Sequence, residues 1–376
     1  MPEAGAEAEA ETGRRDLPRR TRRTRFVCIS DTHNCTVKLP EGDVLIHCGD
    51  LTNKGSITEL SKQVAWLEKA EFECKLVVAG NHDLTLDAEF YEQYGRYFHH
   101  NQGPPQDPAE CQALLARSES LIYLEHASRV VRLASPEGPR TTFSVFGSPY
   151  TPRYGRWAFQ YEPRDDETAA ALWGDIPLDA DIVITHGPAR THLDESRGAA
   201  QGCEVLRQAL WRVRPKIAVC GHIHEARGAE RVRWDLRNGH VRYKELGVQQ
   251  WEDPGVGNEK NSLVDLTARG GNPLDNHASY GVAEAPEPST TRTAMPVETE
   301  PEGTNPGIGT RRLSGDPESA RNEQATLTGR LGRRETCFIN CAVQIASYPH
   351  RGPRVLNKPI VVDLDLPVWD DSAPDD

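Results

Sequence analysis

Short runs of apolar residues recur along the chain, and each one ends next to a residue that can bind a metal ion. Runs of this length, rich in β-branched residues, are typical of strands buried on both faces. The five runs are residues 26–30, 44–48, 76–79, 182–185 and 217–220. Because side chains at the ends of parallel strands gather in one crevice at the sheet edge, the pattern predicts a single metal site that holds more than one ion.

The polar and apolar positions between these runs predict helices and one hairpin. Ser56 followed by Glu59 forms a capping box, and apolar residues at helical spacing follow it, so the second and third strands flank a helix and run parallel. Residues 129–133 and 141–146 alternate on either side of a Pro/Gly-rich turn, which indicates an antiparallel hairpin. Further helices are expected over 166–173 and 205–213. The fold class is therefore α/β with mixed sheets.

Composition divides the chain into ordered and polar segments. A stretch dominated by Gly, Pro, Glu, Thr, Asn and Arg cannot bury enough surface to offset its ordering entropy, and is expected to be a disordered insertion in one domain. The expected organisation is a disordered tail with an Arg cluster (1–24), the main domain (25–250), the insertion (251–335), strands completing the same domain (336–367) and a disordered acidic tail (368–376).

Charge and cysteine usage narrow the function classes. The net charge of −12, from 44 basic and 56 acidic residues, offers no overall basic field for nucleic acid or an anionic membrane. The Arg cluster between Arg14 and Arg25 is either a solvated tail or a nuclear-localisation arm. No apolar stretch predicts a signal peptide or a transmembrane helix. Nine scattered cysteines without a C-x-x-C motif favour a reduced, intracellular protein, so we expect a cytoplasmic location with the nucleus as the alternative.

The motifs that follow the five strands carry the chemistry. In order they are Asp31-Thr32-His33, Gly49-Asp50, Gly80-Asn81-His82-Asp83, Thr185-His186-Gly187 and Gly221-His222-Ile223-His224. This series resembles the calcineurin-like metallophosphoesterase superfamily. Asn34, Leu51-Thr52, Pro188, Gly147-Ser148-Pro149, Asn340 and Val361-Val362-Asp363 make it similar to the branch of metallophosphoesterase-domain-containing (fetal-brain 239) proteins. The resemblance implies a four-layer αββα sandwich with a dimetal site at the C-terminal ends of the strands.

The resemblance also implies a ligand set and a reaction. One ion would be held by Asp31, His33, Asp50 and His224, and the other by Asp50, Asn81, His186 and His222, with the Asp50 carboxylate bridging. Carboxylate, amide and imidazole ligands suit two Mn, Fe, Zn or Co ions, with Mn favoured. A hydroxide shared by the ions would attack phosphorus, while His82 donates a proton to the leaving group and Asp83 orients the His82 imidazole. The expected enzyme is a metal-dependent phosphodiesterase acting on a small diester such as a cyclic nucleotide.

Neighbouring residues have two interpretations each. Asn34 and Asn53 either contact phosphate and the ligands or are ordinary turn residues. His192 and Asp194 either line the cleft or cap a loop, and Arg190 is a candidate phosphate contact. Trp157 and Phe159 either wall the pocket or are buried under their loop, and His47 is expected to be a hydrogen-bonded core histidine.

Other functions remain as alternatives. A phosphomonoesterase of the same fold would use the same ligands, and a non-catalytic scaffold would use the fold to bind protein partners, with residues 252–335 as a further partner-binding segment. A Ser/Thr protein phosphatase is disfavoured because Asn53-Lys54-Gly55 stands where Asp-Arg-Gly is expected. A nuclease is disfavoured by the acidic balance, since no phosphate track is evident.

Overall fold

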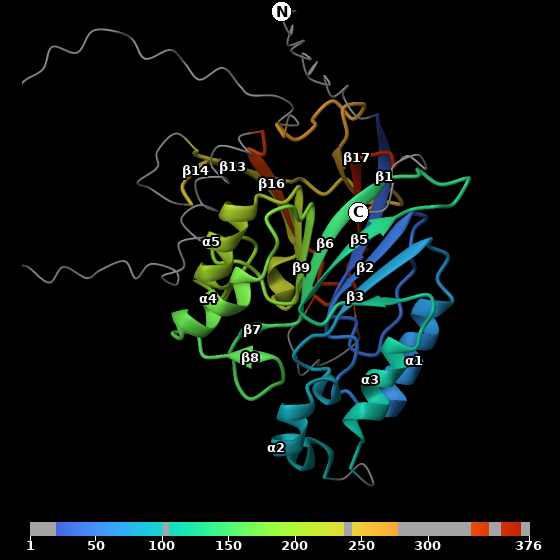
Figure 1. The fold of residues 1–376 in the computed structure, drawn as a ribbon, viewed down its shortest axis with the longest axis vertical. Helices are drawn as coiled ribbons and strands as arrows, with labels where there is room; N and C mark the ends of the chain where they lie inside the picture. Colours follow the sequence, from blue (N-terminus) through green and yellow to red (C-terminus); the bar gives the residue numbers. More distant parts are fainter. Residues whose placement is uncertain (1–19, 101–104, 237–242, 277–331, 346–354, 370–376) are drawn as a thin grey trace, which may run out of the picture.

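The fold is built on two mixed β-sheets (Figure 1). The computed structural model describes residues 20–100, 105–236, 243–276, 332–345 and 355–369. In the first sheet the strand order is β15 (Ser262–Leu266), β17 (Ile360–Pro367), β1 (Thr21–Ile29), β2 (Val44–Cys48), β3 (Cys74–Val78) and β4 (Ile122–Tyr123). Only the β1–β17 pairing is antiparallel in this sheet. The strand predicted from each apolar run in this half of the chain is confirmed.

The second sheet has seven strands. Their order is β14 (Glu245–Gln250), β13 (Gly228–Trp234), β16 (Glu335–Asn340), β12 (Ile217–Cys220), β9 (Ile182–Thr185), β6 (Thr142–Ser148) and β5 (Ala127–Arg132). The central strands β16, β12, β9 and β6 run parallel, and the predicted hairpin is the antiparallel β5–β6 pair. Two short pairs lie outside the main sheets: β7 (Thr151–Pro152) with β8 (Gln160–Tyr161), and β10 (Glu195–Ser196) with β11 (Ala199–Ala200).

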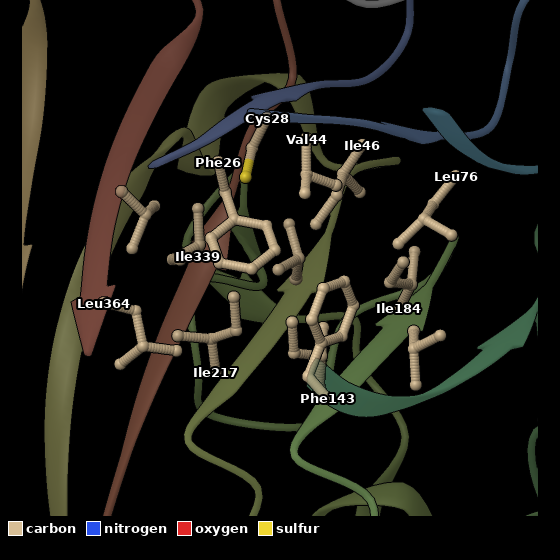
Figure 2. Close-up of a cluster of buried hydrophobic side chains, with 14 of the residues drawn as sticks. Phe26, Cys28, Val44, Ile46, Leu76, Phe143, Ile184, Ile217, Ile339 and Leu364 are labelled. Carbon is tan, nitrogen blue, oxygen red and sulfur yellow. The ribbon is translucent and has the colours of Figure 1, made fainter. Parts of the chain in front are cut away.

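The two sheets pack face to face around one apolar core. Figure 2 shows Phe26 and Val44 of the first sheet pointing toward Phe143 and Ile217 of the second. The rings of Phe26 and Phe143 meet edge to face with their centroids 5.4 Å apart. Strands buried on both faces are near-continuously apolar because neither face meets water.

Helices cover the outer face of each sheet. Helices α1 (Ile57–Glu68), α2 (Ala88–His99) and α3 (Pro108–Ala116), with the 3₁₀ turn η1 (Leu84–Leu86), lie on the first sheet. Helices α4 (Asp166–Gly174) and α5 (Glu204–Val213) lie on the second, and the 3₁₀ turn η2 (His224–Ala226) follows β12. The α1 capping box between Ser56 and Glu59 is present. The fold is thus the predicted αββα sandwich of mixed sheets.

The boundary predicted for the disordered insertion is wrong at its start. Residues 251–276 are described in the structure, and β15 pairs in parallel with β17 at the edge of the first sheet. The strand is only five residues long and its partner lies about a hundred residues away in sequence, so composition around it gave no signal. Residues 277–331, the bulk of the predicted insertion, lie outside the described residues. The two C-terminal strands, β16 and β17, join one sheet each.

The end of the predicted N-terminal tail is also wrong, because β1 already begins at Thr21. Arg25 makes a bidentate pair with Asp363, with both N–O distances at 2.7 Å, and Arg23 lies 3.8 Å from the same carboxylate. These arginines of the predicted cluster are therefore part of the sheet and are partly neutralised. Residues 1–19 and 370–376 lie outside the described residues.

Candidate metal centre

The loops that follow β1, β2, β3, β9 and β12 converge at one edge of the two sheets. Three of their residues, Asp31, His33 and Asp50, have φ angles of 58°, 44° and 53°, a left-handed conformation that non-glycine residues seldom adopt. Gly80 and Gly221 allow close approaches, since a Cβ at Gly80 would lie 2.2 Å from the Asp50 backbone nitrogen and one at Gly221 would lie 2.0 Å from Ser30 Oγ. Strain of this kind persists only where the surrounding structure fixes it, and it concentrates at functional sites.

Backbone hydrogen bonds hold these loops to one another. The His33 N–H donates to the Asp50 carbonyl at 3.0 Å, and the His82 N–H donates to the Asp50 carboxylate at 2.7 Å. Across the two sheets, the His222 N–H donates to Asp31 Oδ2 at 2.9 Å. The carboxylates of Asp31 and Asp50 are thereby fixed at the centre of the crevice, where both sheets contribute side chains.

The two oxygens of Asp50 face two different histidines. His33 Nε2 lies 3.6 Å from Asp50 Oδ2, and His186 Nε2 lies 3.5 Å from Asp50 Oδ1. The other ring nitrogens face backbone carbonyls, with His33 Nδ1 3.1 Å from the Thr52 oxygen and His186 Nδ1 2.8 Å from the Cys48 oxygen. A carbonyl can only accept, so Nδ1 carries the proton in both neutral rings and each Nε2 lone pair faces a carboxylate oxygen.

Two acceptors in contact repel each other unless a cation lies between them. Ligand atoms about 2.0–2.2 Å from a shared ion lie about 3–3.5 Å apart, close to the Asp50–histidine distances. The structure contains two sets of three residues whose ligand atoms all lie within 4.8 Å of one another inside the set. One set is Asp31, His33 and His224, and the other is Asp31, Asp50 and His186. His186 Nε2 also lies 2.8 Å from Asn81 Oδ1. The residues therefore fit two neighbouring ions.

The structure brings all seven predicted ligands to this crevice, but their division between two ions stays a prediction. His222 packs edge to face against His186 with ring centroids 4.9 Å apart and lines the cavity, yet it belongs to neither of the two compact sets. Asp31 belongs to both sets. Asp50 still has the two-sided arrangement expected of a bridging carboxylate.

Burial makes this cluster of charges unfavourable without cations. Burial and the charges of Asp31 and Asp83 raise the pKa of Asp50 well above its ordinary value. Although burial opposes it, the hydrogen bond from His224 holds the pKa of Asp31 well below its usual range. Burial lowers the pKa of His222 to about 3, which keeps that imidazole neutral and able to bind a metal. Neutral imidazoles, carboxylates and an amide are ligands for Mn, Fe, Zn or Co.

His82 lies beside the ligands with its ring fixed on several sides. Its Nδ1 lies 2.9 Å from the Asn53 carbonyl oxygen, which therefore accepts the Nδ1 proton. The Trp157 indole stacks on the ring at 3.9 Å between centroids, and His33 meets it edge to face at 4.8 Å. Burial lowers the pKa of His82 to about 4.

The Asp83 carboxylate binds donors of two ligand-bearing loops. Its Oδ1 accepts from the Thr52 N–H at 2.9 Å and from the Thr52 hydroxyl at 2.7 Å, while Oδ2 accepts from the N–H groups of Gly80 and Leu51 at 2.9 and 3.2 Å. The carboxylate thus ties the loop after β2 to the loop after β3. The Asn53 carbonyl holds the Nδ1 side of the His82 ring, and no side-chain pattern could have identified a backbone acceptor.

A cavity of about 470 Å³ adjoins the ligands and is also lined by residues of α4 and α5. His82, Trp157 and Arg190 are among the residues that line it, so Arg190 stays a candidate phosphate contact. Tyr154 and Arg197 also line it, although the sequence around them gave no signal beyond a polar loop. Phe159 is buried under its loop.

Several residues predicted near the site have structural roles. His192 is buried between two carboxylates, with Nδ1 2.5 Å from Glu230 and Nε2 3.2 Å from Glu245. Asp194 accepts from the Gly202 N–H at 2.7 Å, so this pair follows the loop-capping alternative. His47 bonds to Thr32 at 3.0 Å inside the core, as expected.

Asn34 and Asn53 lie in the loops that carry the ligands. The Asn34 amide donates to Glu59 at 2.7 Å, which connects the first ligand loop to the start of α1. The side-chain oxygens of Asn34 and Asn53 are buried without a hydrogen-bond partner among the described groups. Unpaired buried oxygens are costly in a folded protein, so the two amides are candidates for contacts with bound water.

Comparison with known proteins agrees with this geometry. The family model for the calcineurin-like phosphoesterase matches residues 24–226, and the chain belongs to this family. Over 223 residues it is 39% identical to metallophosphoesterase domain-containing protein 1 of Homo sapiens, covering 57% of this chain and 64% of that protein. It is 33% identical to UPF0046 protein K07C11.7 of Caenorhabditis elegans over 58% of this chain and 68% of that protein.

A third relative is much longer than the matched region. The chain is 45% identical over 214 residues to a protein of Emericella nidulans named probable rhamnogalacturonate lyase C, covering 56% of this chain but only 18% of that protein. The chain thus spans less than two thirds of the length of this relative and of the human one. Among the described residues, no helix is long and apolar enough to cross a membrane.

Proposed function

We propose that the protein is a dimetal-dependent phosphodiesterase that hydrolyses a small phosphodiester, such as a cyclic nucleotide. The observation that carries the proposal is the two-sided contact of Asp50. One of its oxygens faces the Nε2 lone pair of His33, and the other faces the Nε2 lone pair of His186. When bound there, two ions would supply Lewis acidity and a water that ionises near neutral pH. We favour Mn among the metals that suit these ligands.

The residues around the ions divide the remaining work. Asp31, His33, Asp50, Asn81, His186, His222 and His224 hold the metals in this proposal. The cavity takes the phosphodiester, with Arg190 available for its non-bridging oxygens. His82 is the general acid. The Asn53 carbonyl binds Nδ1, and Nε2, on the other side of the ring, is the atom that donates the proton.

The acid role requires a second proton on the His82 ring. In the neutral ring the proton sits on Nδ1, so Nε2 carries no proton and can only accept one. An anionic phosphodiester facing Nε2 would favour the doubly protonated ring, because opposite charges nearby stabilise the charged form. The buried position then delivers the Nε2 proton to the leaving oxygen rather than to bulk water.

A substrate panel tests the proposal. The purified protein, loaded separately with Mn, Fe, Zn or Co, is assayed with bis-p-nitrophenyl phosphate, p-nitrophenyl phosphate and cyclic nucleotides. We expect the diesters to turn over faster than the monoester, and Asp50→Ala to abolish turnover. A preference for the monoester would favour a phosphomonoesterase. Two bound metals without turnover of any ester would favour a protein-binding scaffold.

Location and partners are part of the same proposal. The cysteines of the described residues form no disulfide with one another, which supports a reducing, cytoplasmic compartment. Protein partners would bind through residues 252–335, most of which lie outside the described residues. Fractionation of cells expressing the full chain, with an Arg14–Arg20 substituted version beside it, would test for a nuclear pool.

A further inference from the structure

The ring of His82 is confined by a tryptophan that its reaction chemistry does not require. The Trp157 indole lies nearly parallel to the imidazole, with 3.9 Å between centroids and 29° between planes. His33 meets the same imidazole edge to face at 85°. Together with the Nδ1 contact to Asn53, these rings restrict rotation of His82 about its side-chain bonds.

The indole itself is held by the loop between β7 and β8. The N–H of the next residue, Ala158, donates to the carbonyl of Asn81 at 3.2 Å, so the loop is attached to the peptide that precedes His82. The Phe159 N–H donates to Asp87, the N-cap of α2, at 2.8 Å. The Phe98 ring of α2 lies 5.2 Å from the indole. The stack is therefore part of a built contact between two loops and a helix.

We propose that Trp157 is a positioning residue that holds the His82 ring with Nε2 aimed at the leaving oxygen of the substrate. This inference rests on the proposed function, in which His82 is the general acid. Trp157 lines the same cavity as His82, so it also keeps water away from one face of the imidazole. Proton transfer depends steeply on the placement of the donor, so a ring free to rotate would be a poorer acid.

The step in which this placement matters is departure of the alcohol or phenol. The bond from phosphorus to the leaving oxygen breaks, that oxygen keeps the electron pair and takes the Nε2 proton, and a water oxygen forms the new bond to phosphorus. The proton released by that water restores the ring for the next turnover. A p-nitrophenolate leaves readily as an anion, whereas an unsubstituted phenolate gains more from the proton.

Leaving-group dependence therefore separates positioning from general structural damage. We compare wild type, Trp157→Leu and Trp157→Phe with methyl aryl phosphates whose phenols range from p-nitro to p-methoxy. For Trp157→Leu we expect kcat to fall about 10-fold with the least acidic phenol and less than about 2-fold with p-nitrophenol. Trp157→Phe keeps a stacking ring and should restore most of the difference. Trp66→Leu, in α1 and outside the cavity, is the matched control.

A double-mutant cycle tests whether the effect passes through His82. In a His82→Ala background, Trp157→Leu should change kcat less than about 2-fold, because the group it positions is gone. Additive losses would assign Trp157 to substrate binding or folding instead. Metal content, measured on every variant, should stay at the wild-type value.

A spectroscopic readout does not depend on turnover. In protein with carbon-13-labelled histidine, the signal of His82, assigned by its loss in His82→Gln, should be shifted upfield by the indole ring current. Trp157→Leu should remove that shift. An unshifted His82 signal, or equal loss of kcat with every phenol, overturns the inference while leaving the proposed function intact. A fully metallated wild type that hydrolyses no ester overturns the proposed function, and the role of Trp157 with it.

Discussion

The backbone carbonyl of Asn53 lies 2.9 Å from Nδ1 of His82, and this contact orients the candidate acid. The carbonyl belongs to the loop after β2, two residues beyond Leu51. That loop is itself fixed by the Asp83 carboxylate through the N–H groups of Leu51 and Thr52. Asp83 thus acts on His82 indirectly, through the same loop that presents Asp50. The loop after β2 therefore positions both a proposed metal ligand, Asp50, and the candidate acid, His82.

Replacement of Asp83 by Asn should damage both functions. The amide NH₂ would face donor groups that now bond to a carboxylate oxygen, so at least one buried N–H would lose its acceptor. We expect a loss of about 1–3 kcal/mol in unfolding free energy, together with weaker metal binding and lower turnover. Chemical denaturation and metal titration measure the two. Reduced turnover at unchanged metal affinity would instead mean that Asp83 orients His82 without supporting the metal site.

His82→Ala should have the opposite signature to Asp83→Asn. His82 is not one of the seven proposed ligands, and its Nδ1 faces the Asn53 carbonyl, so metal content should persist while kcat falls by about 10²–10⁴ with esters of weakly acidic alcohols. Metal analysis and steady-state kinetics on the same preparation make the comparison. The exposed His100, at the end of α2, provides the control substitution His100→Ala. Loss of metal together with activity would make His82 a structural or ligand residue.

Sequence patterns located the metal centre because its ligands follow buried strands directly. Asp31 and His186 come from different sheets, yet each is marked by an apolar run followed by a short motif. The regular geometry of strand ends converts that local signal into a shared position in space. Alternating helices and strands predicted an α/β fold with mixed sheets, whereas the four-layer αββα arrangement came from the family resemblance.

The structure supplied what local patterns do not contain. β15 is a five-residue edge strand that owes its order to β17, so neither its own composition nor its neighbours predicted it. The wall of the cavity formed by Tyr154 and Arg197 depends on how loops fold over the site. The acceptor for His82 is the main-chain carbonyl of Asn53. Every residue has such a carbonyl, so only the fold shows which one faces the ring.

Removal of Asp50's charge should separate stability from function. Asp50 is buried beside Asp31 and Asp83, and three neighbouring carboxylates repel one another when no cation is bound. We therefore expect Asp50→Asn to raise the melting temperature of the chelator-treated protein and to abolish the further rise that Mn produces in wild type. Thermal unfolding with and without metal gives both results. A metal-free Asp50→Asn variant that melts below metal-free wild type would contradict this account of the charges.

Stability should also depend on pH through His192, which takes no part in the proposed reaction. The imidazole stacks on Phe338 at 4.1 Å between Glu230 and Glu245. Its Nε2 contact with Glu245, at 3.2 Å, is an ion pair without hydrogen-bond alignment. Although burial opposes it, the two carboxylates raise the pKa of His192 above its ordinary 6.5. Burial also opposes ionisation of Glu245, but His192 and Arg207 lower the pKa of that carboxyl below 4.5.

The signs of these two shifts define a pH window. A raised histidine pKa adds stability that is complete below about pH 6.5 and is lost as the pH rises through the folded-state value. A lowered carboxyl pKa adds stability that is complete above about pH 4.5 and is lost as the pH falls through the folded-state value. Both contributions are therefore full between about pH 4.5 and 6.5. Each unit by which the His192 pKa is raised corresponds to about 1.4 kcal/mol lost on the alkaline side.

A neutral substitute at this position tests the window. His192→Gln should unfold with less free energy than wild type near pH 6, and the difference should shrink steadily toward pH 9. Denaturation of the metal-loaded protein at several pH values measures it, with His100→Gln as the exposed control. A difference that stays constant across this range would mean that His192 contributes by packing on Phe338, and that the ring is neutral between its two carboxylates.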